Sequence, residues 1–193
     1  MYLKQSPIYK CNLGLGFVME YFKGTLKEGK VEDAKSNLAG CELNVYLIEK
    51  LGKMGLVNIK AESKYDEVSR VDVIGESKGN HMLMKVFPNN TKKIYFLPNG
   101  KNYFEAKFQL SGKTLKQVKK MKDAGLDNIH IYILKNVTTK KTWLIKEIYK
   151  LGGVILQSEI NEEFIIQRID DLKIKYDKIM QRNIYMVKNK NAN

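Results

Sequence analysis

The sequence is short of the residues that mark several common protein classes. It contains two cysteines, two histidines and three prolines among 193 residues. Cys11 and Cys41 match no zinc-ligand spacing, and His81 and His130 lie far from both, so we expect no structural zinc site and assign the histidines structural roles. In a reducing compartment the two cysteines are expected to be buried thiols rather than a disulfide.

Long apolar runs are also missing. No stretch approaches the ~20 apolar residues that a membrane-spanning helix needs, and the first residues lack the basic and then apolar pattern of a signal peptide. There is no linker rich in Gly, Ser or Pro and no internal repeat. We therefore expect one intracellular, cytoplasmic domain over residues 1–193, without a membrane partner.

Positive charge is what the chain has in excess. Its 34 Lys and Arg residues against 21 Asp and Glu give a formal net charge of +13. Such a field attracts polyanions, because neutralised phosphates release their condensed counterions. The alternative is a lysine-rich proteome with solvated surfaces. The charge favours a nucleic-acid partner but specifies no chemistry.

Hydrophobic periodicity predicts the elements of the first 136 residues. A short helix is expected at residues 17–22, and a longer one from about Asp33 to the glycines at 52 and 55. The apolar stripe of the longer helix consists of Leu38, Cys41, Val45, Ile48 and Leu51. Strands are expected at residues 57–63, 70–77, 81–87, 92–97, 101–110 and 127–136, with a connection at 65–69. The last of these strands is nearly all apolar, which is typical of burial on both faces.

The remaining elements are mostly helical. A helix over residues 114–125 is predicted, with Thr114 as its N-cap and Gly125 as its stop. A helix over 140–152, a strand over 153–157 and a long helix from about Asn161 follow. The stripe of the long helix is formed by Ile165, Ile169, Leu172, Tyr176 and Ile179. That stripe fits packing against the chain's own core or a coiled-coil dimer. The order of elements predicts an α/β sandwich around a mixed sheet.

One group of residues in the expected strands carries chemistry. Glu105 and Lys107 are two residues apart in a strand, so they project from the same face. If the strand of residues 70–77 pairs with it, Asp72 can lie opposite Glu105. Two close carboxylates repel each other, so such a pair usually binds a cation. Oxygen ligands favour Mg²⁺ or Mn²⁺, and Lys107 would then assist an attacking water.

These residues lie in a segment that resembles the core of the PD-(D/E)xK nuclease superfamily, in particular its restriction-endonuclease-like and archaeal Holliday-junction-resolvase-like branches. The resemblance covers about residues 34–134. The segment GCELNVYLIEKLGKMG supplies a helix with Glu42, RVDVIGE supplies Asp72, and YFEAKFQ supplies Glu105 and Lys107. The segments TLKQVKKM and IHIYIL close the core. Two departures are Val71 in place of proline and the 32 residues between Asp72 and Glu105.

The resemblance implies a fold and an activity. The expected fold is a restriction-endonuclease-like mixed central sheet flanked by helices, with an inserted hairpin and extra C-terminal helices at about 140–187. The expected activity is Mg²⁺-dependent hydrolysis of phosphodiester bonds in DNA. Glu42 and the carbonyl of Ala106 are further candidate metal ligands, and Glu76 is a rival to Asp72. The alternatives are a non-catalytic basic nucleic-acid-binding protein and an RNA nuclease of the same fold.

Residues outside the metal site are candidates for contacts with nucleic acid. They are Gln109, Lys113, Lys116, Lys119 and Lys120, each of which also fits a solvated surface. Arg70 shares a strand face with Asp72, and Glu20 could join the site from the N-terminal segment. Two sites are needed to cut both strands, so a homodimer fits the expected activity.

Overall fold

The computed structural model describes residues 15–64 and 70–190, so the predicted connection at 65–69 and Cys11 lie outside the described residues. The chain divides into two compact units. The sheet unit is Leu43–Glu162, and the helical unit comprises the described parts of Met1–Glu42 and Glu163–Asn193. That residues 1–193 form one domain stays a prediction. None of the described helices combines the length and the apolar character needed to cross a bilayer.

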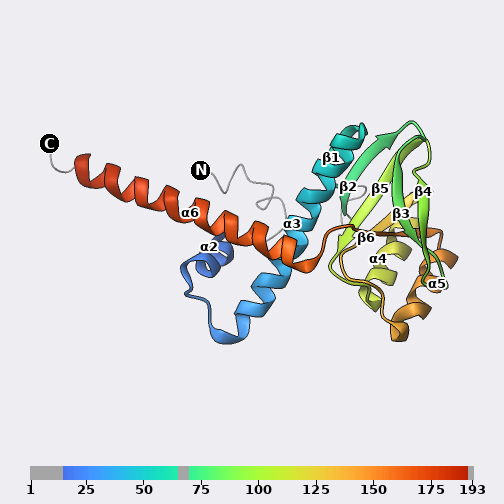
Figure 1. The fold of residues 1–193 in the computed structure, drawn as a ribbon, viewed down its shortest axis with the longest axis horizontal. Helices are drawn as coiled ribbons and strands as arrows, with labels where there is room; N and C mark the ends of the chain where they lie inside the picture. Colours follow the sequence, from blue (N-terminus) through green and yellow to red (C-terminus); the bar gives the residue numbers. More distant parts are fainter. Residues whose placement is uncertain (1–14, 65–69, 191–193) are drawn as a thin grey trace. The chain divides into compact units, whose positions relative to one another are not determined.

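The sheet unit is built on one mixed sheet of seven strands in the order β1-β2-β5-β6-β7-β3-β4 (Figure 1). The strands are β1 (Val57–Lys64), β2 (Arg70–Ser77), β3 (Met82–Val86), β4 (Lys92–Phe96), β5 (Gly100–Lys107), β6 (Ile129–Ile133) and β7 (Gly153–Gln157). The neighbours β5, β6 and β7 are parallel, and every other pair is antiparallel. The expected mixed sheet flanked by helices is therefore confirmed, and its assignment to a particular fold family remains a proposal.

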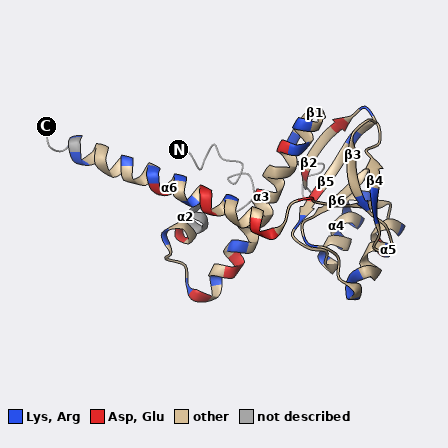
Figure 2. Ribbon diagram, in the orientation of Figure 1, with Lys and Arg blue, Asp and Glu red and all other residues tan. Residues whose placement is uncertain are grey.

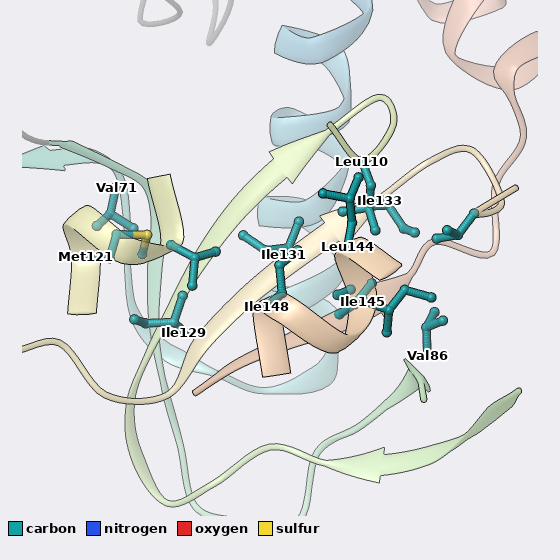
Figure 3. Close-up of a cluster of buried hydrophobic side chains, with 13 residues drawn as sticks. Val71, Val86, Leu110, Met121, Ile129, Ile131, Ile133, Leu144, Ile145 and Ile148 are labelled. Atoms are coloured by element: carbon teal, nitrogen blue, oxygen red, sulfur yellow. The ribbon is translucent and has the colours of Figure 1, made fainter. Parts of the chain in front are cut away.

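Two helices cover one face of the parallel strands. The connections β5–β6 and β6–β7 contain α4 (Gly112–Asp123) and α5 (Thr142–Lys150), the latter preceded by the short 3-10 helix η3 (Thr139–Lys141). Figure 3 shows Ile129 and Ile131 of β6 packed with Met121 of α4 and Ile148 of α5. All five residues of β6 are buried, as its apolar sequence predicted. This packed face forms the main core of the sheet unit.

Gly55 and Gly125 end their helices, as predicted, through their backbone conformation, whereas Gly52, also predicted as a stop, lies inside its helix. Gly55 has φ +94° and directly follows α3 (Val31–Met54). Its N–H donates to the carbonyl of Gly52 at 3.1 Å, and the N–H of Leu56 donates to the carbonyl of Leu51 at 3.1 Å. These two bonds are the Schellman pattern, which satisfies carbonyls at the end of a helix. Gly125 ends α4 with the same pattern.

Two details of the predicted helices were wrong. Ser111, not Thr114, is the N-cap of α4; Thr114 lies at N3 and its hydroxyl accepts the N–H of Ser111 at 3.2 Å. In α3 the predicted stripe residues Val45 and Ile48 are only half-buried, whereas further leucines are fully buried. The missed leucines are Leu43 and Leu47. Cys41 is buried, as expected.

The inserted hairpin and the C-terminal segment meet at one edge of the sheet. Strands β3 and β4 pair with each other, as predicted, and β3 also pairs with β7, where Val86 lies opposite Ile155. The segment predicted as a helical C-terminal addition thus supplies β7, an interior strand of the sheet. The insertion therefore leaves β2 and β5 as direct neighbours.

The helical unit contains α2 (Leu15–Lys23), the 3-10 helix η2 (Glu28–Lys30), the first part of α3 and α6 (Glu162–Lys190) from Glu163 onward. The rings of Phe22 in α2 and Tyr176 in α6 lie 5.5 Å apart, measured between centroids. Tyr176 is buried, together with Ile165 and Ile169 of the predicted α6 stripe. The first half of that stripe is therefore core, as one of the two interpretations proposed.

Candidate active site

Strand pairing brings Asp72 and Glu105 together. The antiparallel partners of β2 and β5 run from Ser77 opposite Gly100 to Val73 opposite Phe104. One further step in this register sets Asp72 opposite Glu105. Beyond the last backbone pair the Asp72 carboxylate accepts the N–H of Ala106 at 3.0 Å. Asp72 is thus held against the strand that carries Glu105.

Glu105 is buried beneath the helices of the main core. Only 2% of the residue is exposed. Its parallel partner on β6 is Ile131, and partners in a sheet project from the same face, so Glu105 points toward the side covered by α4 and α5. The apolar surroundings strip this carboxyl of water.

The pKa of Glu105 reflects this environment. Burial raises it well above the ordinary value of 4.5, and the charge of Asp72 and a hydrogen bond to its side chain raise it further. The nearby Lys107 lowers it by a smaller amount. The ionised form of Glu105 is therefore disfavoured where it stands beside Asp72. A bound cation would favour that ionised form.

Lys107 completes the predicted group on β5. It is the last residue of the strand and is half-buried, and its partner on β6 is Ile133. It therefore shares the face of Glu105, as the two-residue spacing predicted. The structural role of the Ala106 N–H was not foreseen, because a backbone donor leaves no signal in the sequence.

Glu42 belongs to the helical unit, whereas Asp72, Glu105 and Lys107 belong to the sheet unit. Within the helical unit Glu42 is 4% exposed and accepts a hydrogen bond from Nε of Arg168 at 3.0 Å. A buried carboxylate paired with a guanidinium is a stable arrangement. The predicted role of Glu42 as a metal ligand stays a prediction.

Glu76 lies elsewhere on β2. Its partner on β5 is Lys101, four residues before Glu105, and its carboxylate accepts the side-chain amide of Asn58 at 3.1 Å. Of the two acids of β2, Asp72 is the one in contact with the backbone beside Glu105. Glu20 is exposed on α2 of the helical unit.

The candidate nucleic-acid contacts lie on the surface of α4 and in the short segment between β5 and α4. Figure 2 shows the basic residues of α4. The candidate lysines of that helix, Lys113, Lys116, Lys119 and Lys120, are all exposed, as is Lys122. Gln109 is exposed, but β5 ends at Lys107, so its predicted place on the strand was wrong. The side chain of Arg70 lies outside the described residues.

The two histidines have structural partners. His130 is fully buried; its Nδ1 lies 3.3 Å from the carbonyl of Tyr103 and its Nε2 lies 3.2 Å from the hydroxyl of Tyr95. The carbonyl can only accept, so Nδ1 carries the proton and Nε2 accepts from Tyr95. Burial lowers the pKa of His130 to about 4, so the ring is neutral. Nδ1 of His81 lies 2.9 Å from the hydroxyl of Ser77.

Within the described residues no three His, Cys, Asp or Glu side chains gather as a metal-binding group. Among the described residues, the candidate site therefore offers the two carboxylates of Asp72 and Glu105.

Comparisons of the chain with protein-family models, curated proteins and solved structures gave no match. Any assignment of function therefore rests on the geometry of Asp72, Glu105 and Lys107, together with the sequence resemblance described above.

Proposed function

We propose that this protein is a metal-dependent endonuclease that hydrolyses phosphodiester bonds in DNA, with Asp72, Glu105 and Lys107 in its active site. The supporting observation is the buried Glu105 beside Asp72, with Lys107 on the same strand face. Burying a carboxyl next to another one lowers stability, and pairs of this kind are concentrated at sites of chemistry. The restriction-endonuclease-like fold is part of the same proposal.

The ligands available suit Mg²⁺ or Mn²⁺. Carboxylate oxygens are the preferred protein ligands of these hard ions, and Mg²⁺ normally keeps several waters, so two carboxylates are a sufficient protein contribution. Asp72 and Glu105 would hold the ion, and the resemblance adds the carbonyl of Ala106. When bound, the ion would polarise a phosphate oxygen and lower the pKa of a coordinated water.

The protein groups have separate tasks in this proposal. The N–H of Ala106 orients the Asp72 carboxylate before any ligand arrives. The ammonium of Lys107 holds the attacking water or a phosphate oxygen by hydrogen bonds and stabilises the negative charge that develops during hydrolysis. The apolar face around Glu105 excludes water and so strengthens these electrostatic interactions.

The choice of DNA rests on charge and on the resemblance. The chain carries a formal net charge of +13, and the lysines of α4 are exposed. These lysines and Gln109 would contact the phosphate backbone, which positions a substrate without reading its sequence. If the protein cleaves RNA in preference to DNA, the alternative of an RNA nuclease of the same fold replaces this proposal.

The test is nicking of supercoiled plasmid DNA with Mg²⁺ or Mn²⁺. We expect Asp72→Asn, Glu105→Gln and Lys107→Ala each to lower the rate by about a hundredfold or more. The control variant Glu76→Gln changes an acid of the same strand and should keep the wild-type rate. Circular dichroism of each variant checks that the fold is intact.

Two results would overturn the proposal. One is the absence of nicking by the wild-type protein under all metal conditions, and the other is equal nicking by Glu105→Gln and wild type. DNA binding without any cleavage would instead support the non-catalytic nucleic-acid-binding hypothesis.

A further inference from the structure

The hairpin of β3 and β4 carries four exposed apolar side chains on one face of the sheet. Met82 lies opposite Phe96, and Met84 lies opposite Ile94. Partners across two strands project from the same face, and so do residues two apart in one strand, so the four side chains are neighbours. Their exposed fractions are 52% and 55% in the first pair and 40% and 64% in the second. We call these four residues the hairpin patch.

The helices of the main core leave the hairpin patch uncovered. The row of Met82 and Met84 continues along β3 to Val86, which is buried and lies opposite Ile155 of β7. Figure 3 shows Val86 within the main core. Beyond it, β4 is the last strand of the sheet. A group of adjacent exposed apolar side chains marks a binding surface, whereas single exposed ones are ordinary.

The sequence around the hairpin patch is strongly basic. From Ser77 to Lys122 there are eleven lysines and a single acid, the buried Glu105. Figure 2 shows basic residues along β4. Lys92 and Lys93 are both exposed, and Lys92 shares the face of the patch and donates to the side-chain oxygen of Asn136. Neither lysine takes part in an ion pair within the described residues, so their charge is available to a polyanion.

We propose that the hairpin patch and its lysines bind single-stranded DNA. Unpaired bases have flat apolar faces that stack on exposed aromatic and apolar side chains, while lysines contact the phosphates. In a duplex the base faces are stacked on one another, and the outer surface offers mainly phosphates, which gain nothing from Phe96 or Met82. The combination of apolar and basic side chains therefore favours a single strand over a duplex.

The extent of the basic sequence favours a nucleic acid over a peptide. An acidic peptide would need lysines only beside the patch, whereas the basic run continues through α4, as expected for contact with a longer polyanion. The choice of DNA over RNA rests on the proposed function. In the order of the sheet, β6 and β7 lie between β5 and the hairpin, so this surface is separate from the candidate active site.

The first test measures binding of the full chain to a labelled oligo(dT) of about 15 nucleotides and to a duplex of the same length, by fluorescence anisotropy in EDTA. The wild type should bind the single strand more tightly. Phe96→Ala should weaken that binding about tenfold, through the loss of one stacked base, and leave duplex binding unchanged. Val57→Ala changes an exposed apolar residue at the opposite edge of the sheet and should alter neither affinity.

The second test measures how the affinity for oligo(dT) depends on salt. Lys92→Gln should reduce the slope of log affinity against log salt concentration by about 0.7, because one phosphate contact is lost. Lys35→Gln is the matched control, since Lys35 is exposed but already lies 3.2 Å from the carboxylate of Glu32. It should leave the slope unchanged. Circular dichroism checks that each variant keeps its fold.

Several results would overturn the inference. Equal binding of single strand and duplex by the wild type is one, and unchanged oligo(dT) binding by Phe96→Ala is another. Tighter binding of oligo(U), or of a peptide of alternating Glu and Val, with a loss in Phe96→Ala, would assign the hairpin patch to RNA or to an acidic protein. EDTA prevents metal-dependent cleavage, so a protein that binds oligo(dT) through Phe96 but never nicks DNA would refute the proposed function alone.

Discussion

Replacement of His130 should remove a specific part of the acid sensitivity of this protein. The folded-state pKa of His130 is about 4 because of burial, against an ordinary value of 6.5. Between these two values the unfolded chain binds a proton that the folded chain excludes, so the free energy of unfolding falls as the pH falls from 6.5 to about 4. The gap corresponds to a loss of about 3 kcal/mol, at roughly 1.36 kcal/mol for each pH unit.

Glu105 acts in the opposite direction over part of the same range. Its raised pKa means that the folded state keeps a proton that the unfolded chain has lost above pH 4.5, so its contribution to stability is present at low pH and is lost as the pH rises through the folded-state pKa. The assay for His130 is therefore made in a Glu105→Gln background, by urea unfolding followed through the fluorescence of Trp143, the single tryptophan.

His130→Gln should then flatten the stability profile between pH 6.5 and 4, since glutamine keeps a donor and an acceptor but does not titrate. Burial raises the pKa of Glu159, but hydrogen bonds from Lys50 and Tyr46 lower it overall, so its contribution changes only below pH 4.5 and leaves the range from 6.5 to 4.5 clear. An unchanged slope in His130→Gln would refute the reasoning, and so would a His130 pKa near 6.5 measured by NMR in the folded protein.

Three further changes have defined outcomes. Glu105→Gln should raise the midpoint of urea unfolding at pH 8, because it removes a buried carboxyl whose ionised form is disfavoured; a lower midpoint would contradict the burial argument. Arg168→Ala should cost about 2–3 kcal/mol by leaving the buried Glu42 carboxylate without its guanidinium, and Glu42→Gln in the same chain should restore part of that loss. Gly153→Ala should cost about 1–3 kcal/mol, since an added Cβ would lie 2.8 Å from a side-chain carbon of α5; a neutral result in thermal melts would mean that the helix shifts freely.

Local features of the fold could be predicted from the sequence. Gly55 and Gly125 end their helices because glycine adopts a positive φ without steric cost. The glycine in the sequence therefore marks the position where the helix can end. Alternation placed Glu105 and Lys107 on one face of a strand. Thr114 was taken for the N-cap because it is a preferred capping residue, but so is Ser111, and the helix starts one turn earlier.

Long-range pairing could not be predicted from periodicity. Strand β3 pairs with β7, about seventy residues later in the chain, and nothing in the hairpin sequence specifies that neighbour. The contact of Asp72 with the N–H of Ala106 likewise depends on where the β2–β5 ladder ends. The order of Asp72, Glu105 and Lys107 in the sequence suggested a site. That the two acids lie close together depends on the pairing of β2 with β5, which the sequence does not specify.

Binding of Mn²⁺, measured by isothermal titration calorimetry on the full chain, tests the central claim most directly. We predict one ion for each chain, with binding lost in Asp72→Asn and in Glu105→Gln and retained in Glu76→Gln and Lys107→Ala. Absence of Mn²⁺ binding to the wild-type chain, or equal binding to wild type and Glu105→Gln, would contradict the claim that Asp72 and Glu105 form a metal site.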